Sequence, residues 1–377
     1  MDSIAVFNVG FGDCFLLKND NQGILVDCGS KNYKKPEKKK VAESIQRFCR
    51  DNCIDLSSVV ITHFHEDHYN ILGSLTGASI STLYIPDFFS FDEIKLEFLQ
   101  LMIQPRKSLY FKKANEILLL LPSLLKLPVY NHKLVIKCIK RGDRIDSVPD
   151  PYSVLWPDVR KAFDPEAVVL FILQSLLDPS LFSEELSAYA DELTNQYYDC
   201  YIKAANQSKT NDIVIGQERI RIASEMNAVI DKAISFNEKN NLGIKLSGNI
   251  KSQISRIQNA ISIVFETGTD LFLGDITQDI FDNRILNDVA NKQYRAIKVA
   301  HHGTKRHYTE KLPQSCYLII SNGKYKGWDL TAMYPLRYAN RKFICTNCTG
   351  CEYWQATSGT KSVHEFQCGI HTPFELL

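Results

Sequence analysis

The sequence of 377 residues contains no long uninterrupted hydrophobic run. Its most apolar stretch, EILLLLPSLLKLPVY at 116–130, is broken by Pro122, Lys126 and Pro128, whereas a membrane-spanning helix needs roughly 20 consecutive apolar residues. The first residues also lack the basic start, apolar run and small-residue cleavage site of a secretory signal. We therefore expect a cytoplasmic protein that does not insert into a membrane.

The sequence also lacks a strong charge of either sign, and it shows no internal repeat or low-complexity tract. The formal net charge of +1 provides no global argument for nucleic-acid binding. Basic residues are nevertheless concentrated locally in KNYKKPEKKK at 31–40. We expect this run to form a solvated loop.

The cysteines do not indicate a disulfide framework. There are 11 of them, an odd number, and they are scattered along a long chain without an export signal. Such a pattern is typical of reduced thiols in a cytosolic protein.

Both ends of the sequence are rich in predicted strands, and the region between them is helical. Apolar runs between turn residues predict strands, and these lie at 3–9, 14–20, 23–30, 57–62, 81–87, 132–145, 152–158, 260–275, 295–300 and 316–322. Apolar residues at helical spacing predict helices at 39–52, 92–127, 160–256 and 277–292. We expect an α/β sandwich formed by 1–158 and 257–343, with a helical insertion at 159–256. A separate central helical domain is the alternative.

Residues 62–68, THFHEDH, crowd three histidines and two acids behind the apolar run SSVVI. His63 and His65 are two positions apart at the end of a predicted strand, so both side chains can point the same way. Asp67 and His68 follow them. This arrangement offers two imidazoles to one cation and a carboxylate plus an imidazole to a second, as in two-metal sites. Such ligands suit Zn, Mn or Fe(II) rather than Ca.

Other strand ends supply further candidate ligands. Asp27 ends ILVDCG, Asp275 ends LFLGD, and His301 and His302 follow IKVA. Each alone has an ordinary interpretation as a helix cap, a turn residue or a hairpin acid. Acids and histidines that repeatedly end apolar strands favour a shared metal site.

Together these motifs resemble the metallo-β-lactamase superfamily, because THFHEDH matches its H-x-H-x-D-H signature and Asp27, Asp275 and His301 follow the order of its other motifs. FNVGFGDCFLL, ILVDCG, NAISIVFETGTDLFLGDIT and VAHHGT look like the ComEC-like branch, which includes the nuclease-like domain of DNA-uptake channels. The resemblance covers roughly 1–90, 130–158 and 257–325. It implies an αββα sandwich with a helical insertion.

The resemblance also implies two divalent metal ions, Zn or Mn, and a role for each candidate residue. His63 and His65 would bind the first metal, and Asp67 and His68 the second. Asp275 would bridge the two, and His301 would complete the second site. His302 would be a further ligand or an acid–base group.

Three more residues are expected around the metals. Asp13 and Asp27 would orient ligands. Many superfamily members complete the first site with a histidine that lies between the signature and the Gly-Asp motif, where this sequence has only His132. The ComEC-like pattern places Asn259 there. We therefore expect an incomplete set of ligands at the first metal.

The resemblance implies hydrolysis in which the metals activate a water, Asp67 orients it, and water or His302 protonates the leaving group. The leading hypothesis is a phosphodiesterase or nuclease acting on DNA, an effector in bacterial defence, with Lys298, Lys305 and Arg306 holding phosphates. A hydrolase of a small lactone, thioester or cyclic nucleotide is an alternative. A protein with a vestigial site that binds a protein partner through its helical insertion is another.

The C-terminal segment, 344–377, contains a second cluster of possible metal ligands. Cys348-x2-Cys351 and His364-x3-Cys368 are separated by twelve residues, a spacing similar to that of zinc fingers. A structural zinc would stabilise a small lobe here. The alternative is that these residues belong to ordinary sheet strands.

Overall fold

The computed structural model of the chain describes residues 3–75, 78–87, 91–126, 130–158, 184–206, 212–244, 259–322, 333–338, 340–346 and 374–376. The chain forms two compact units. One, here called the sandwich unit, contains Met1–Pro86, Lys137–Asp158 and Gln258–Leu377, and the other, the helical unit, contains Asp87–Ile136 and Val159–Ile257.

The first sheet has seven strands in the order β14-β1-β2-β3-β4-β5-β6, all of which belong to the sandwich unit except the start of the edge strand β6. Their bounds are β1 Ser3–Val6, β2 Phe15–Asn19, β3 Gln22–Val26, β4 Asp55–Val60, β5 Ile80–Pro86, β6 Tyr130–Ile139 and β14 Phe374–Leu376. Strands β1 to β3 pair antiparallel, whereas β3, β4 and β5 run parallel.

The second sheet also has seven strands, in the order β13-β12-β11-β10-β9-β8-β7. Their bounds are β7 Arg144–Ile145, β8 Tyr152–Trp156, β9 Val264–Glu266, β10 Asp270–Phe272, β11 Gln293–Lys298, β12 Gln314–Ile320 and β13 Lys342–Cys345. Strands β10 to β13 run parallel.

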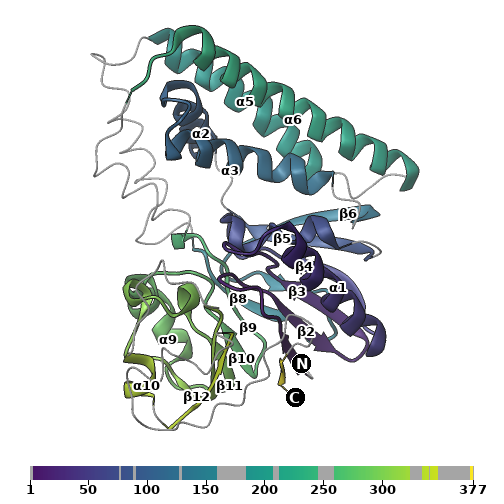
Figure 1. Cartoon of the computed structure of the whole chain (residues 1–377), viewed down its shortest axis with the longest axis vertical. Helices are drawn as coiled ribbons and strands as arrows, with labels where there is room; N and C mark the ends of the chain where they lie inside the picture. Colours follow the sequence, from purple (N-terminus) through teal and green to yellow (C-terminus); the bar gives the residue numbers. More distant parts are fainter. Residues whose placement is uncertain are drawn as a thin grey trace. The chain divides into compact units, whose positions relative to one another are not determined.

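Helices connect the parallel strands of both sheets (Figure 1). Helix α1, Lys35–Asp51, joins β3 to β4. The connection from β10 to β11 contains α8, Gln278–Ile280, then a π-helical turn at Phe281–Ile285, and then α9, Leu286–Val289. Helix α10, Met333–Arg337, lies between β12 and β13. This is the αββα sandwich that the sequence predicted.

The lysine-rich run at 31–40 is not a loop throughout, because α1 already begins at Lys35. Pro36 lies at the start of the helix, where a missing amide donor costs nothing. The side chain of Glu37 accepts a hydrogen bond from the Lys34 amide at 3.0 Å. Helix-start signals therefore outweigh the charge of the run.

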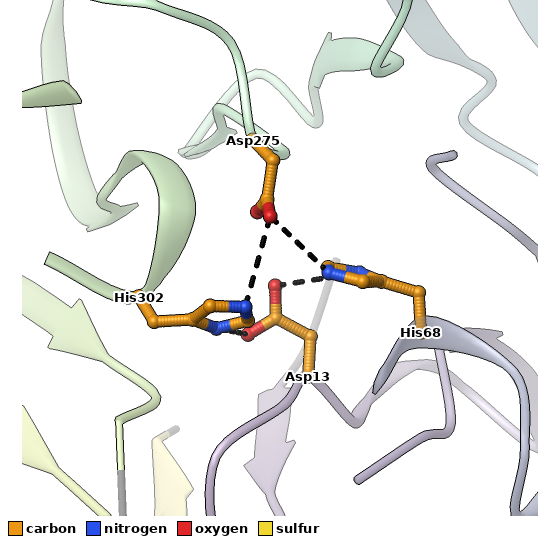
Figure 2. A group of neighbouring side chains, drawn as sticks. All are labelled: Asp13, His68, Asp275 and His302. Carbon is orange, nitrogen blue, oxygen red and sulfur yellow. Dashed lines mark hydrogen bonds and ion pairs between the residues drawn. The ribbon is translucent and has the colours of Figure 1, made fainter. Parts of the chain in front are cut away.

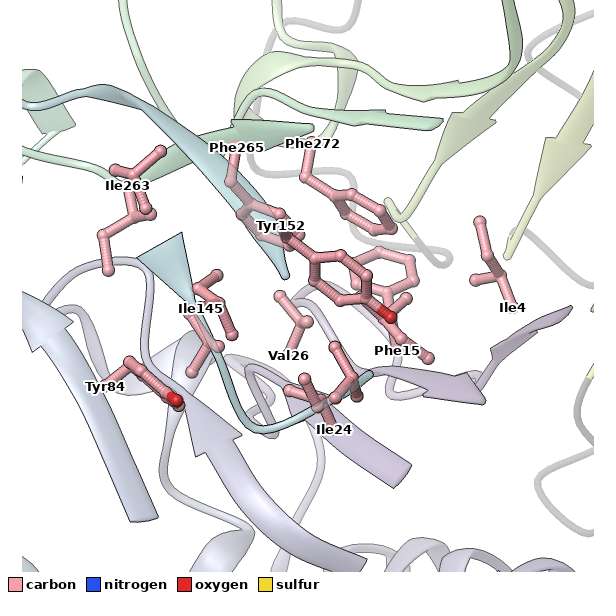
Figure 3. Packing of buried hydrophobic residues seen from close by; sticks show 14 of the residues in the cluster. Ile4, Phe15, Ile24, Val26, Tyr84, Ile145, Tyr152, Ile263, Phe265 and Phe272 are labelled. Carbon is pink, nitrogen blue, oxygen red and sulfur yellow. The ribbon is translucent and has the colours of Figure 1, made fainter. Parts of the chain in front are cut away.

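Apolar side chains from both sheets meet in one core (Figure 3). Phe265 and Phe272 stack with ring centroids 4.8 Å apart, and Phe15 of the first sheet lies 5.9 Å from Phe272 of the second. All three rings are at most 2% exposed. This packing holds the two sheets against each other.

The helical unit packs four helices together (Figure 1): α2 Phe91–Ile103, α3 Leu109–Leu125, α5 Glu184–Asn206 and α6 Asp212–Asn240. The sequence-based division assigned α2 and α3 to the sandwich, but their apolar faces pack on α5 and α6 instead. Phe98 of α2 lies 5.7 Å from Tyr197 of α5. None of the described helices is both long and apolar enough to span a membrane.

The end of the chain differs from its predicted division. A boundary at 343/344 would cut through β13, and β14 pairs antiparallel with β1. The candidate zinc ligands Cys348, Cys351, His364 and Cys368 lie outside the described residues, as does the part of the predicted helical insertion at 159–183. The described cysteines form no disulfide.

Candidate metal centre

The candidate metal centre lies in loops that follow the carboxyl ends of parallel strands. Asp27 follows β3 and His63 follows β4, and these neighbouring strands end at the same edge of the first sheet. Asp275 follows β10 and His302 follows β11, which are neighbours in the second sheet. The two edges bring the candidate ligands together.

Two glycine-containing turns hold the signature loop in place. The amide of Asp13, from GFGD, donates to the carbonyl of Asp67 at 3.2 Å, and the amide of Cys28, from ILVDCG, donates to that of His68 at 2.7 Å. A Cβ atom at Gly29 would lie 2.3 Å from the carbonyl carbon of Asp67. These turns therefore require glycine so that the backbone can approach the signature closely.

One carboxylate oxygen lies at the centre of the site. The Nε2 atoms of four histidines approach Asp275 Oδ2, at 3.6 Å from His63, 3.3 Å from His68, 3.7 Å from His301 and 3.7 Å from His302. All five side chains are buried. Figure 2 shows Asp275 with His68 and His302, and with the nearby Asp13.

The opposite nitrogen of each of these rings contacts an oxygen of another side chain. The Nδ1 contacts are Thr62 Oγ1 at 3.3 Å for His63, Asp27 Oδ2 at 2.8 Å for His68, Thr304 Oγ1 at 2.5 Å for His301, and Asp13 Oδ1 at 3.1 Å for His302. Histidines that bind metals are usually oriented in this way through the second ring nitrogen. The anchors direct every Nε2 atom toward Asp275.

These residues fit a divalent metal ion. Separations of 3.3–3.7 Å between Nε2 and Oδ2 are too long for good hydrogen bonds. They resemble the edge of about 3.3 Å that a tetrahedral site has when its metal–ligand bonds are about 2.0 Å. The Nε2 atoms of His68 and His302 are also buried without a hydrogen-bond partner. A bound cation would satisfy both.

Asp13, His68, Asp275 and His302 form a group whose ligand atoms lie within 4.8 Å of one another (Figure 2). In this group Asp13 already has two partners, because Oδ1 contacts His302 Nδ1 and Oδ2 forms an ion pair with Lys298. Both oxygens of Asp13 therefore have partners away from Asp275, whereas Asp67 Oδ2 lies 3.6 Å from His302 Nε2, the nitrogen that faces Asp275.

Burial and neighbouring charges shift the pKa values of these groups in opposite directions. Burial lowers the pKa of His63 and of His301, which favours the neutral imidazole that binds metals. Burial would also lower the pKa of His302, but Asp13 and Asp275 raise it to about 9. Burial would raise the pKa of Asp275, yet the surrounding histidines hold it well below its usual range.

Backbone strain is concentrated at this site. Asp27, His301 and His302 have φ angles of 54°, 45° and 56°. Non-glycine residues rarely adopt such left-handed conformations, and they tend to occur where function requires them.

Not every predicted site residue lies as expected. Lys298 was predicted to hold phosphate, but it is only 2% exposed, pairs with Asp13 and donates to the carbonyl of Gly274 at 3.1 Å. Lys298 is the last residue of β11, and its burial there keeps its ammonium group away from a phosphate in solvent. Lys305 and Arg306 are exposed. Asn259 Nδ2 lies 3.4 Å from His307 Nε2.

Three residues that sequence reasoning did not select also support the site. Thr62 and Thr304 anchor histidines, and the ring of His307 stacks on that of His301 with centroids 4.0 Å apart. His307 Nδ1 also lies 3.0 Å from Thr304 Oγ1. The signal was present in HHGTKRH, where Thr304 and His307 follow His301 by three and six positions.

Comparison with known proteins agrees with this geometry. Residues 7–88 match the model of the metallo-beta-lactamase superfamily, a region that includes Asp13, Asp27 and the signature but ends before Asp275. No curated protein matches the chain. The family match and the cluster of buried ligands together support a metal-dependent hydrolase.

Proposed function

We propose that this protein is a metal-dependent phosphodiesterase that cleaves DNA with two divalent cations, Zn or Mn. The observation that carries the proposal is the convergence of four histidine Nε2 atoms on Asp275 Oδ2. DNA as the substrate, and a role in bacterial defence, rest on the resemblance of the motifs to the ComEC-like branch.

The cations, when bound, would lower the pKa of water and offset the negative charge that develops on the attacked phosphoryl group. Burial would raise the pKa of Asp67, but His302 and His68 lower it well below its usual range. Asp67 therefore remains a carboxylate and can accept a hydrogen bond from the attacking water. The leaving oxygen would take its proton from water or from His302, whose two ring nitrogens face the carboxylates of Asp13 and Asp67.

Exposed basic residues flank the candidate centre and favour a polyanionic substrate. Lys305 and Arg306 follow His302 within four residues. Burial lowers the pKa of Lys38, and the carboxylate of Glu66, next to Asp67, partly offsets this effect. The turn that leads into the lysine-rich start of α1 is joined to the end of the signature loop, because the Ser30 amide donates to Asn70 Oδ1 at 3.0 Å. Such cations could contact the phosphate backbone without reading its sequence.

Cleavage assays test the proposal directly. Purified protein is incubated with supercoiled, linear and single-stranded DNA in the presence of Mn²⁺, Mg²⁺ or Zn²⁺. We expect metal-dependent cleavage that is lost in the double variant Asp67→Ala, His68→Ala. The variant Asp279→Ala, which changes an exposed acid of the same unit, is the matched control and should cleave normally.

Two results would argue against this function. Hydrolysis of bis(p-nitrophenyl) phosphate without cleavage of any DNA would indicate a small-molecule substrate. Absence of both activities in protein that holds its metals would contradict phosphodiesterase activity altogether.

A further inference from the structure

We propose that the adjacent histidines His301 and His302 serve different metal positions. His302 joins Asp67 and His68 at the second position, and His301 joins His63 and His65 at the first, with Asp275 shared by both. This assignment rests on the proposed metal-dependent hydrolase. It differs from the assignment implied by the motifs, in which His301 completes the second position.

The contacts of His302 place it at the second position. Its Nε2 lies 3.6 Å from Asp67 Oδ2 and 3.7 Å from Asp275 Oδ2. Its ring centroid lies 5.3 Å from that of His68. Asp67, His68, Asp275 and His302 would together hold the cation at this position.

The first position lacks a ligand without His301. His63 Nε2 lies 3.0 Å from His65 Nδ1 and 3.6 Å from Asp275 Oδ2, so these three side chains converge. His301 Nε2 approaches the same oxygen of Asp275 at 3.7 Å. We assign it as the fourth ligand of this position, which then needs no histidine from between the signature and the Gly-Asp motif.

The surroundings of His301 orient its ring independently of His302. Thr304 Oγ1 lies 2.5 Å from His301 Nδ1 and 3.0 Å from His307 Nδ1, and the ring of His307 stacks on that of His301. Asp13 instead contacts Nδ1 of His302. Each of the two rings is therefore held by its own partner, as metal-binding histidines usually are.

The backbone explains how neighbouring residues can reach one carboxylate. His301 and His302 both have left-handed φ angles, 45° and 56°, and the amide of His301 donates to the carbonyl of Gly274 at 3.1 Å. This tight turn holds both residues against the loop that carries Asp275. The strain of two consecutive left-handed residues is accounted for if each ring has a ligand position to fill.

Metal content tests the assignment without measuring activity. The full-length chain is dialysed against Zn²⁺ or Mn²⁺, and the ratio of metal to protein is measured by elemental analysis. We expect about two ions in the unaltered protein, as in two-metal sites, and about one in His301→Ala, His302→Ala, His63→Ala and His68→Ala. Lys305→Ala, an exposed change close by, should retain both ions.

Double variants decide which histidines share a metal. A second substitution at the same metal position should remove no further ion. The double variant His63→Ala with His301→Ala should therefore retain one ion, and so should the double variant His68→Ala with His302→Ala. The crossed pair His68→Ala, His301→Ala should retain none. The reverse pattern, in which the crossed pair keeps one ion and His63→Ala, His301→Ala keeps none, would overturn the assignment.

Further controls keep the test interpretable. Loss of both ions from a single variant would also contradict the proposal, because it would indicate one undivided site. Circular dichroism melting identifies variants that fail to fold, and asparagine then replaces alanine at the same position. Protein that shows the expected metal pattern but cleaves no DNA would refute the nuclease and leave this assignment intact. Protein that binds no metal would refute both.

Discussion

The ammonium group of Lys298 forms an ion pair with the carboxylate of Asp13, and these side chains are 2% and 1% exposed. Lys298 ends β11 in the second sheet, whereas Asp13 precedes β2 in the first. Lys298 Nζ also lies 3.5 Å from Asp275 Oδ1. This buried cation therefore offsets the charge of two carboxylates and connects the two sheets behind the candidate metal centre.

Replacing Lys298 should destabilise the protein strongly. We expect Lys298→Met to lower the free energy of unfolding by about 3–5 kcal/mol, because removal of one partner leaves an uncompensated buried charge on Asp13. Urea denaturation followed by circular dichroism measures the change. Lys292→Met is the control, since Lys292 is 45% exposed and pairs with Glu266; such a pair contributes at most about 1 kcal/mol. Equal effects of the two substitutions would contradict this role of Lys298.

Asp27→Asn should weaken metal binding about 10–100-fold, the usual effect of altering a group that orients a ligand. Asp27 Oδ2 contacts His68 Nδ1 at 2.8 Å. An amide that donates to Nδ1 would favour the ring tautomer with a proton on Nε2, which removes the lone pair needed by the metal. Competition with a chelating dye measures the affinity. Asp55→Asn, an exposed change in the same unit, should leave it unaltered, and an unaltered affinity in Asp27→Asn would refute the prediction.

Metal binding should raise the melting temperature of the protein. A cation that binds only the folded state adds about 2.7 kcal/mol of stability at 100 times its dissociation constant, which corresponds to a rise of roughly 5–10 °C. Differential scanning calorimetry with added Zn²⁺ or Mn²⁺, and then with a chelator, tests this. The double variant Asp67→Ala, His68→Ala should respond less, and an equal response in the variant would locate the bound metal elsewhere.

Lys305 and Arg306 should contribute to DNA binding through charge alone. In the cleavage-deficient double variant Asp67→Ala, His68→Ala, each further change to alanine should weaken binding to duplexes of different sequence equally. It should also reduce the slope of log affinity against log salt by about 0.9, the value for one phosphate contact. Fluorescence anisotropy of labelled DNA measures both. Lys292→Ala serves as the control, because Lys292 precedes the first residue of β11, whereas the candidate site follows the last. A slope that stays the same in the Lys305 and Arg306 variants would exclude these contacts.

The helical unit depends on a hydrogen bond that compensates for a proline. Pro122 lies inside α3 and has no amide hydrogen for the carbonyl of Leu118, and the hydroxyl of the fully buried Tyr197 donates to that carbonyl at 2.7 Å. We expect Tyr197→Phe to lower the free energy of unfolding by about 1–3 kcal/mol. In the Pro122→Ala background, where the amide is restored, the same change should cost less, and a double-mutant cycle by urea denaturation measures the difference. An undiminished cost would show that Tyr197 acts in another way.

Several features of the fold and site were predictable from local sequence. The signature THFHEDH, the acids Asp27 and Asp275 and the pair of histidines at 301–302 all follow apolar strands, and the structure brings them together. The start of α1 was missed because lysines suggested a solvated loop, although Pro36 and Glu37 are typical of a helix start.

Other features could not be read from sequence because they depend on which surfaces pack together. The apolar faces of α2 and α3 could pack in either unit. Only their contacts with α5 and α6 show that they belong to the helical unit. Lys298 resembles any basic residue near a phosphate site until its burial beside Asp13 is known.

The sequence by itself determined the types of candidate ligand, their order and the strand ends that carry them, because these depend on local apolar runs and motif spacing. Only the tertiary structure decided how these side chains are arranged around Asp275. The positions of His301 and His302 depend on a left-handed turn, on Thr304 and Asp13, and on two sheets held in place by a shared core. Those contacts join residues far apart in the chain, so no local pattern could specify them.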